Sequence, residues 1–149
     1  MTHTVTNPFF PENSLFDTNI RGVAYGDETF IAVGDGGGWA YSNDGRAWGN
    51  ITPANPDVNP NPFKDTRINS VAYGDGRFVA VGEKGVMAYF AGGFWVRIPV
   101  NPLNRPFGAD GINGVAYGGG RFVAAGNGGK MAYSAGSADY MPVRARLYI

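Results

Sequence analysis

Residues 68–90 read INSVAYGDGRFVAVGEKGVMAYF, and the chain repeats this stretch with small changes at residues 20–42 and 112–134. Val23, Val71 and Val115 occupy equivalent positions, so the copies are spaced by 48 and 44 residues. Periods in this range are typical of solenoids, propellers and folds with threefold pseudosymmetry. The fold is therefore decided by one short unit that occurs three times.

Each copy predicts four short strands and no helix, because no apolar stripe with a 3.6-residue period survives the glycines. In the middle copy the first three strands are expected at residues 68–74, 78–82 and 87–89. The fourth strand is expected to begin at an aromatic residue, which is Trp48, Trp95 or Tyr140.

The turns between these strands carry hairpin signals. Asp75-Gly76 separates the first two strands of the middle copy, and such a pair suits a tight hairpin whose two central residues have positive φ. Asp27-Glu28 and Gly119-Gly120 stand at the same place in the other copies. Glycine-rich runs mark the second hairpin of each copy at residues 34–38, 82–85 and 126–129.

The second strand indicates how the units pack. A strand exposed on one face alternates apolar and polar residues, whereas Phe78, Val79, Ala80 and Val81 are apolar throughout. We therefore expect both faces of this strand to be covered, as in a blade that lies between two neighbouring blades.

The predicted fold class is all-β, with three four-stranded antiparallel propeller blades in a single domain of residues 1–149. Three blades cannot close a ring of the usual four to eight, so we expect a homodimer that completes a six-bladed β-propeller. A monomeric β-trefoil or β-prism is the alternative. The expected segments are an N-terminal strand and lead-in at 1–19, followed by repeats at 20–67, 68–111 and 112–149.

The turn after the third strand of the first copy reads Ser42-Asn43-Asp44-Gly45-Arg46-Ala47-Trp48. It resembles the Asp-box, or BNR repeat, of sialidase-like β-propellers in bacterial proteins, and the second and third copies have degenerate boxes. The resemblance implies a structural role for Ser42, Asp44, Gly45 and Trp48, in which the aspartate accepts backbone N–H groups and the tryptophan packs between strands. It also implies an extracellular or cell-surface location, with no signal peptide recognised in this chain.

Composition argues against several function classes. Lys plus Arg and Asp plus Glu are equal at 12 each, so no net charge favours nucleic acid or an anionic membrane. No apolar run approaches the length of a membrane span. There is no Cys, and His3 is the only histidine. We therefore expect no metal, no cofactor and no membrane insertion.

The carboxylates argue against catalysis. A glycosidase needs two of them facing one another across a sugar, and nothing in the sequence pairs the three glutamates Glu12, Glu28 and Glu83. The sequence therefore predicts a protein that is not an enzyme. The remnant of a sialidase-type glycoside hydrolase is kept as an alternative.

Recognition is the remaining class, and three residues are candidates for ligand binding: Trp39, Arg77 and Arg121. Trp39 aligns with Val86 and Lys130, so the core does not demand Trp there, and an exposed indole could stack on a ligand. A blade-edge cover or a subunit contact explains it equally well. We expect a non-catalytic, lectin-like module whose partners are glycans and a second copy of itself. A structural scaffold of a cell surface or virion is a further alternative.

Overall fold

The computed structural model describes residues 19–49, 61–99, 106–135 and 139–142 and contains three antiparallel sheets, which we call blades 1, 2 and 3. Blade 1 is formed by β1 (Ile20–Gly26), β2 (Thr29–Gly34) and β3 (Trp39–Ser42). Blade 2 is formed by β4 (Ile68–Gly74), β5 (Arg77–Gly82), β6 (Met87–Ala91) and β7 (Phe94–Arg97). Blade 3 is formed by β8 (Ile112–Gly118), β9 (Arg121–Gly126), β10 (Met131–Ala135) and β11 (Asp139–Pro142).

The predicted strand order is confirmed in blades 2 and 3, where each strand pairs with the next along the chain. In blade 1 the expected fourth strand is represented, among the described residues, by a single bridge between Tyr41 and Gly49. The lead-in expected at 1–19 lies outside the described residues except for Asn19. No helix in the described part of the chain is long and apolar enough to cross a membrane.

The first hairpin of each blade has the predicted geometry. Both central residues have positive φ in all three blades, at 50° and 74° for Asp75 and Gly76. A one-turn 3-10 segment joins the second and third strands of each blade, namely η1 (Asp35–Gly37), η2 (Glu83–Gly85) and η3 (Asn127–Gly129). The two turns that connect the first three strands therefore have the same backbone conformation in all three blades.

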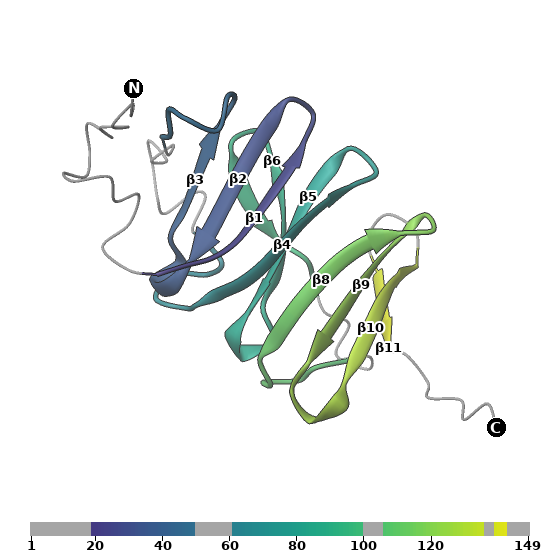
Figure 1. Ribbon diagram of the computed structural model, residues 1–149. Coiled ribbons are helices and arrows are strands. Elements are labelled where there is room, and N and C mark those ends of the chain that lie inside the picture. The colour runs from purple at the N-terminus through teal and green to yellow at the C-terminus, as the bar shows by residue number, and fades with distance from the viewer. Residues whose placement is uncertain (1–18, 50–60, 100–105, 136–138, 143–149) are drawn as a thin grey trace.

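The blades stand side by side, with the first strands β1, β4 and β8 next to one another in that order (Figure 1). We call the face of a blade that contacts the next blade its downstream face, and the opposite one its upstream face. Ile31 and Val33 of blade 1 pack on Ile68, Phe78 and Ala80 of blade 2.

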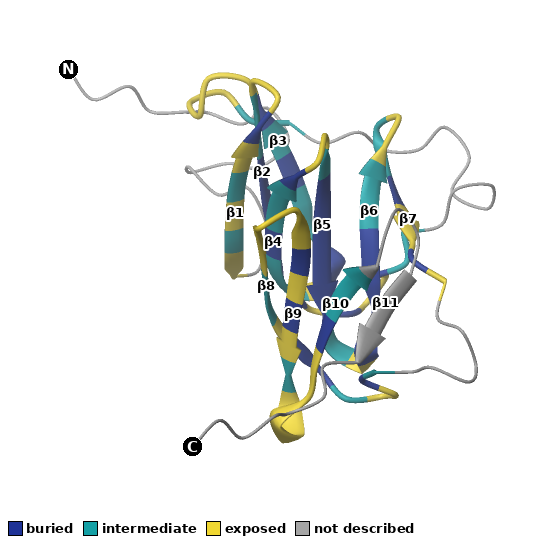
Figure 2. Ribbon diagram, turned by 90° about the vertical axis from the view of Figure 1, so that its right-hand side faces the viewer, coloured by how far each residue is buried: buried dark blue, intermediate teal, exposed yellow. Residues whose placement is uncertain are grey.

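The downstream face of blade 2 packs in the same way on blade 3. Here Val79, Val81 and Met87 contact Ile112 and Ala124. Blade 2 therefore contributes to both layers of the core, and the prediction that its second strand is covered on both faces is confirmed. Residues 78–82 are all buried, and β5 is dark blue over most of its length in Figure 2.

Candidate functional site

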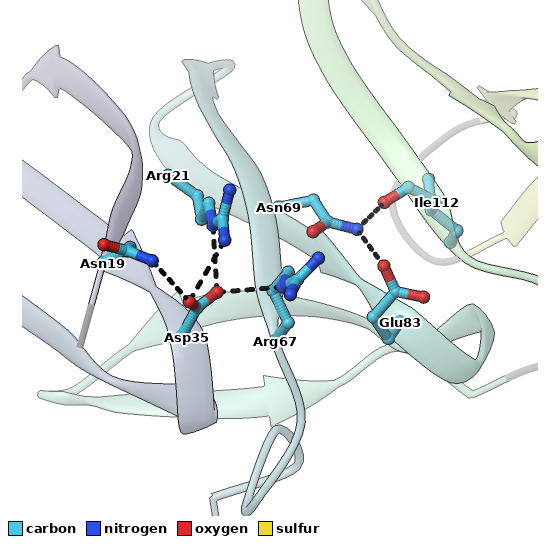
Figure 3. Close-up of polar contacts among 7 residues, drawn as sticks. All are labelled: Asn19, Arg21, Asp35, Arg67, Asn69, Glu83 and Ile112. Atoms are coloured by element: carbon cyan, nitrogen blue, oxygen red, sulfur yellow. Dashed lines mark hydrogen bonds and ion pairs between the residues drawn. The ribbon is translucent and has the colours of Figure 1, made fainter.

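Polar side chains gather where the first strand of each blade begins and the second strand ends. In every blade the second residue of the first strand contacts the first residue of the 3-10 segment. The three pairs are Arg21–Asp35 at 2.9 Å, Asn69–Glu83 at 3.1 Å and Asn113–Asn127 at 2.9 Å. We call Asn19, Arg21, Asp35, Arg67, Asn69 and Glu83 the rim cluster; Figure 3 shows these residues.

A bulge in the first strand positions these side chains. The register with the second strand shifts between Ile20 and Gly22, and it shifts at the equivalent place in blades 2 and 3. The residue left without a paired position is Arg21 in blade 1. A bulge bends its strand and re-aims a side chain, so the repeat places a polar residue at the rim in each blade.

A glycine at the end of the second strand brings the 3-10 segment close to the first. A Cβ on Gly34 would lie 2.1 Å from the carbonyl oxygen of Asn19. The next backbone N–H, that of Asp35, donates to the same oxygen at 2.9 Å. A larger residue than glycine would push the acidic residue away from the rim.

Asp35 is the centre of the cluster, because it accepts from three side chains. Arg21 approaches it with two nitrogens, at 2.9 and 3.2 Å, and the Nε of Arg67 lies 2.9 Å away. The amide of Asn19 donates at 3.3 Å. The hydrogen bonds from Arg21 are the main cause that holds the pKa of Asp35 below its usual value, and the same pair raises the pKa of Arg21.

The cluster also joins neighbouring blades. Arg67 belongs to the segment that enters blade 2, whereas Asp35 belongs to blade 1. Asn69 of blade 2 donates to the carbonyl oxygen of Ile112 in blade 3 at 2.8 Å, as well as to Glu83 (Figure 3). The rim is therefore a continuous polar band across three blades.

The arrangement presents hydrogen-bond donors at an exposed rim. The guanidinium groups of Arg21 and Arg67 share the carboxylate of Asp35, while the carboxylate of Glu83 leaves the rim cluster neutral overall. The side chains of Arg21 and Arg67 are 37% and 47% exposed. A guanidinium presents five N–H donors that suit carboxylate and carbonyl oxygens. In the part of the chain that the structure describes, no three His, Cys, Asp or Glu side chains group as metal ligands would.

Trp39 lies on the downstream face of blade 1, where it contacts aromatic side chains of blade 2. Its ring is 5.2 Å from that of Phe90 and 6.2 Å from that of Trp95. The alignment with Val86 and Lys130 is wrong by one residue, because Trp39 pairs with Val33 as Met87 pairs with Val81. The position is an inter-blade contact in blades 1 and 2, which favours packing as the role of Trp39; ligand contact stays a prediction.

Arg77 and Arg121 occupy equivalent places at the start of the second strand, at the opposite end of the blade from the rim cluster. Each guanidinium lies over a tyrosine of the third strand, 5.2 Å from the Tyr89 ring and 5.1 Å from the Tyr133 ring. The structure brings neither of them to Trp39 or to the rim. Ligand binding by this pair also stays a prediction.

The Asp-box-like turn forms a compact hydrogen-bonded loop. One carboxylate oxygen of Asp44 accepts the N–H groups of Arg46 and Ala47 at 2.8 and 2.9 Å, and these bonds are the main cause that lowers the pKa of Asp44. The hydroxyl of Ser42 accepts the N–H of Gly45 at 2.8 Å. The indole of Trp48 donates to the carbonyl of Gly45 at 3.0 Å. These contacts hold the turn together, and the structural role expected of its four residues stays a prediction.

The sequence interpretation missed the rim cluster, although a signal for it exists. A polar residue follows the first isoleucine of every repeat, and Asp, Glu or Asn follows the glycine that ends every second strand. Each position looks like an ordinary surface residue by itself. Only their recurrence, 14 residues apart in all three copies, indicates that the two positions meet.

No protein-family model matches the chain, and no curated protein sequence matches it. Among solved structures, the chain is similar to one described as YCF48 bound to D1 peptide, with a TM-score of 0.63 and 20% identity over 84% of this chain. It is also similar to YCF48 from Cyanidioschyzon merolae, with a TM-score of 0.62 and 18% identity over 85% of this chain. The chain spans 40% and 37% of the lengths of these two proteins. YCF48 is a β-propeller protein, so the likeness supports the propeller fold, not the Asp-box family specifically.

Proposed function

We propose that this protein is a non-catalytic binding module whose rim cluster holds an extended segment of another protein. The observation that carries the proposal is the pair Arg21 and Arg67 on a single carboxylate at an exposed rim. Their remaining N–H groups suit the carbonyl and carboxylate oxygens of a peptide. The solved structure of YCF48 bound to D1 peptide supports a peptide as the ligand class for this fold.

Glycans are the second candidate ligand, as expected of a lectin-like protein. Sugar hydroxyls accept hydrogen bonds from Arg and Asn side chains, and the rim offers both types next to one another. A sugar site also uses an aromatic platform. Trp39, the platform expected from the sequence, packs on Phe90 and Trp95, and for this reason the peptide is preferred.

We further propose that the module acts as a six-bladed ring made of two chains. Propellers have four to eight blades, and six is the only multiple of three in that range. In this form the two rim clusters lie in one ring. A structural scaffold of a cell surface or virion and a sialidase-type remnant are the weaker proposals. A scaffold does not explain the exposed charged side chains of the rim, and a glycosidase needs two carboxylates that face each other across a sugar.

Labelled protein applied to an array of random 15-residue peptides and to a glycan array tests the ligand class. Arg67→Gln is the chosen variant, because it removes one guanidinium group from the rim and leaves the two-nitrogen contact of Arg21 with Asp35 in place. Arg46→Gln is the matched control, because Arg46 is exposed in the turn after β3, at the other end of blade 1. We expect the protein to bind peptides, Arg67→Gln to weaken this binding about tenfold, and Arg46→Gln to leave it unchanged. Binding to glycans alone, or equal losses in both variants, would contradict the peptide site.

A further inference from the structure

A tyrosine packs on a glycine at both internal blade interfaces. Gly26, the last residue of β1, lies under the ring of Tyr73 in β4, so closely that a Cβ on the glycine would be 2.0 Å from the ring. Gly74, the last residue of β4, lies under the ring of Tyr117 in β8 in the same way, again at 2.0 Å. These glycines are needed for close approach, since neither has a positive φ.

Each end of the three-blade stack has one half of this contact. Gly118 ends β8 as Gly26 and Gly74 end their strands, but a Cβ built on it would have no atom of the described residues within 4 Å. Its φ is not positive either, so its own turn does not require glycine. At the other end, Tyr25 is the counterpart of Tyr73 and Tyr117, and its ring is exposed. One end has a glycine without a tyrosine, and the other has a tyrosine without a glycine.

The apolar residues around these two positions are uncovered in the same pattern. Ile20 on the upstream side of blade 1 is 49% exposed, whereas its counterparts Ile68 and Ile112 are 0% exposed. Val23 is exposed, and its counterpart Val71 is buried. On the downstream face of blade 3, Val123 and Met131 are exposed. Large exposed apolar patches mark interaction surfaces in soluble proteins.

We infer that the downstream face of blade 3 binds the upstream face of blade 1 of a second copy of this chain, with Tyr25 of that copy on Gly118. The inference rests on the proposed six-bladed ring and names its closing contact. Two such contacts related by a twofold axis close the ring, so the assembly ends at two chains instead of growing into a filament.

The occupant is a second copy because the two exposed faces complement each other, not merely because both are apolar. The tyrosine that Gly118 lacks at one end of the stack is present as Tyr25 at the other end, and the glycine that Tyr25 lacks is present as Gly118. Blades 1 and 2, and blades 2 and 3, already form this interface twice with the same repeat. The proposed contact between blade 3 and blade 1 of the second copy would use the same types of residue contact as these two interfaces.

The polar rim is compatible with this closure. Asn69 donates to the carbonyl oxygen of Ile112 across the interface between blades 2 and 3. Asn113, its counterpart in blade 3, is placed to donate to the carbonyl oxygen of Ile20 in the second copy. Asn127 stands in blade 3 where Asp35 and Glu83 stand in the other blades. It is neutral, so the closing contact brings no like charges together.

Sedimentation velocity of the whole chain over a wide concentration range, without ligand, tests the inference. Gly118→Ala adds a Cβ that meets nothing in one chain but overlaps the Tyr25 ring of the second copy. We expect the wild type to dimerise and the variant to raise the dimer Kd about tenfold or more, since overpacking an interface is costly. Circular dichroism checks that the variant is folded.

Gly114→Ser is the matched control. Its counterpart Ser70 faces blade 3, and the hydroxyl of Ser70 accepts the N–H of Val115 at 3.2 Å. A serine at position 114 is therefore expected to keep the dimer, with the N–H of Val23 as its donor in the second copy.

Three results would overturn the inference: a wild type that stays monomeric at every concentration, a Gly118→Ala protein that dimerises as tightly as the wild type, or a mass of three or more chains. Because the experiment contains no ligand, its outcome tests the dimer contact independently of the peptide-binding proposal.

Discussion

Blades 2 and 3 contain nearly the same second strand, RFVAVG in β5 and RFVAAG in β9. In blade 2 this strand is buried on both faces, whereas in blade 3 buried and exposed residues alternate. Val79 is 1% exposed and its counterpart Val123 is 36% exposed. The difference does not come from the strand itself. A strand that is apolar on both faces specifies two neighbours, and blade 3 has one of them within the described chain.

The largest expected effect compares Met87 and Met131, which are 3% and 40% exposed. Met87→Ala leaves a cavity between blades 2 and 3 and is expected to lower the free energy of unfolding by about 2–5 kcal/mol. Met131→Ala removes an exposed side chain and is expected to change it by less than about 0.5 kcal/mol in dilute protein. Urea denaturation of both variants measures the difference.

The Met87→Ala and Met131→Ala variants are also expected to differ in how their effect on the free energy of unfolding depends on protein concentration. If the downstream face of blade 3 is covered by a second copy, the effect of Met131→Ala grows with concentration, because dimerisation stabilises the folded chain by mass action. The effect of Met87→Ala does not need the second copy. Equal effects of the two substitutions in dilute protein would mean that the two faces are equally covered in one chain.

The next prediction concerns the glycines that end β4 and β8. Gly74→Ala places a Cβ 2.0 Å from the Tyr117 ring, and the forced shift is expected to cost about 1–3 kcal/mol. Gly118→Ala meets no atom within 4 Å in the part of the chain that the structure describes, and it is expected to leave the melting temperature of dilute protein unchanged. Thermal unfolding followed by circular dichroism checks both. A similar loss in the two variants would show that close approach is not the reason for the glycine in blade 2.

Much of the fold could be predicted from the sequence because its signals are local. The hairpin pairs Asp75-Gly76 and Gly119-Gly120 require positive φ by themselves, and the apolar run from Phe78 to Val81 specifies two covered faces by composition. Trp39 was placed wrongly because a glycine-rich turn can be aligned in more than one way. The 48- and 44-residue spacings of the repeat align Trp39 with Met87 and Met131, and the strand pairing agrees with that alignment.

The site was harder to predict, because it depends on strand bulges within each blade and on contacts between blades. Arg67 and Asp35 are separated by 32 residues in the chain, and their ion pair forms only when blade 2 stands beside blade 1. Arg21 and Asp35 meet because a strand bulge turns the arginine toward the rim. The first contact needs two repeats, and the second forms within one repeat but depends on a bulge that the residue pattern does not reveal.

A smaller effect is expected in the first hairpin, where blades 1 and 2 differ at one position. Glu28 has a φ of 57° and stands where blade 2 has Gly76. A left-handed conformation is costly for a residue with a Cβ, so Glu28→Gly should stabilise the protein by about 0.5–1 kcal/mol. The reverse change, Gly76→Glu, should destabilise it by a similar amount. Chemical denaturation of the two variants checks the sign, and a shift of both in the same direction would contradict the backbone explanation.

The smallest effect separates the Asp-box-like turn of blade 1 from the corresponding turn of blade 2, which has Gly92 and Gly93 with positive φ and no aspartate. Asp44 holds the turn of blade 1 as a carboxylate, since it accepts the backbone N–H groups of Arg46 and Ala47. Asp44→Asn keeps an acceptor oxygen but removes the charge, and is therefore expected to lower the melting temperature slightly at neutral pH.

The pH dependence of this difference tests its cause. The pKa of Asp44 is lowered in the folded protein, first by the bonds from Ala47 and Arg46. A lowered folded pKa means that the carboxylate stabilises the fold fully above its unfolded pKa, roughly 3.9, and that this contribution is lost as pH falls through the lower folded value. The melting temperatures of wild type and Asp44→Asn should therefore differ at pH 7 and converge in strongly acidic solution. Asp35 adds a pH dependence of the same sign that is common to both proteins, so it cancels in the comparison. Asn43→Ala in the same turn is the control, and its difference from wild type should not change with pH. A gap between wild type and Asp44→Asn that stays constant down to the acid limit would show that the charge of Asp44 does not hold the turn.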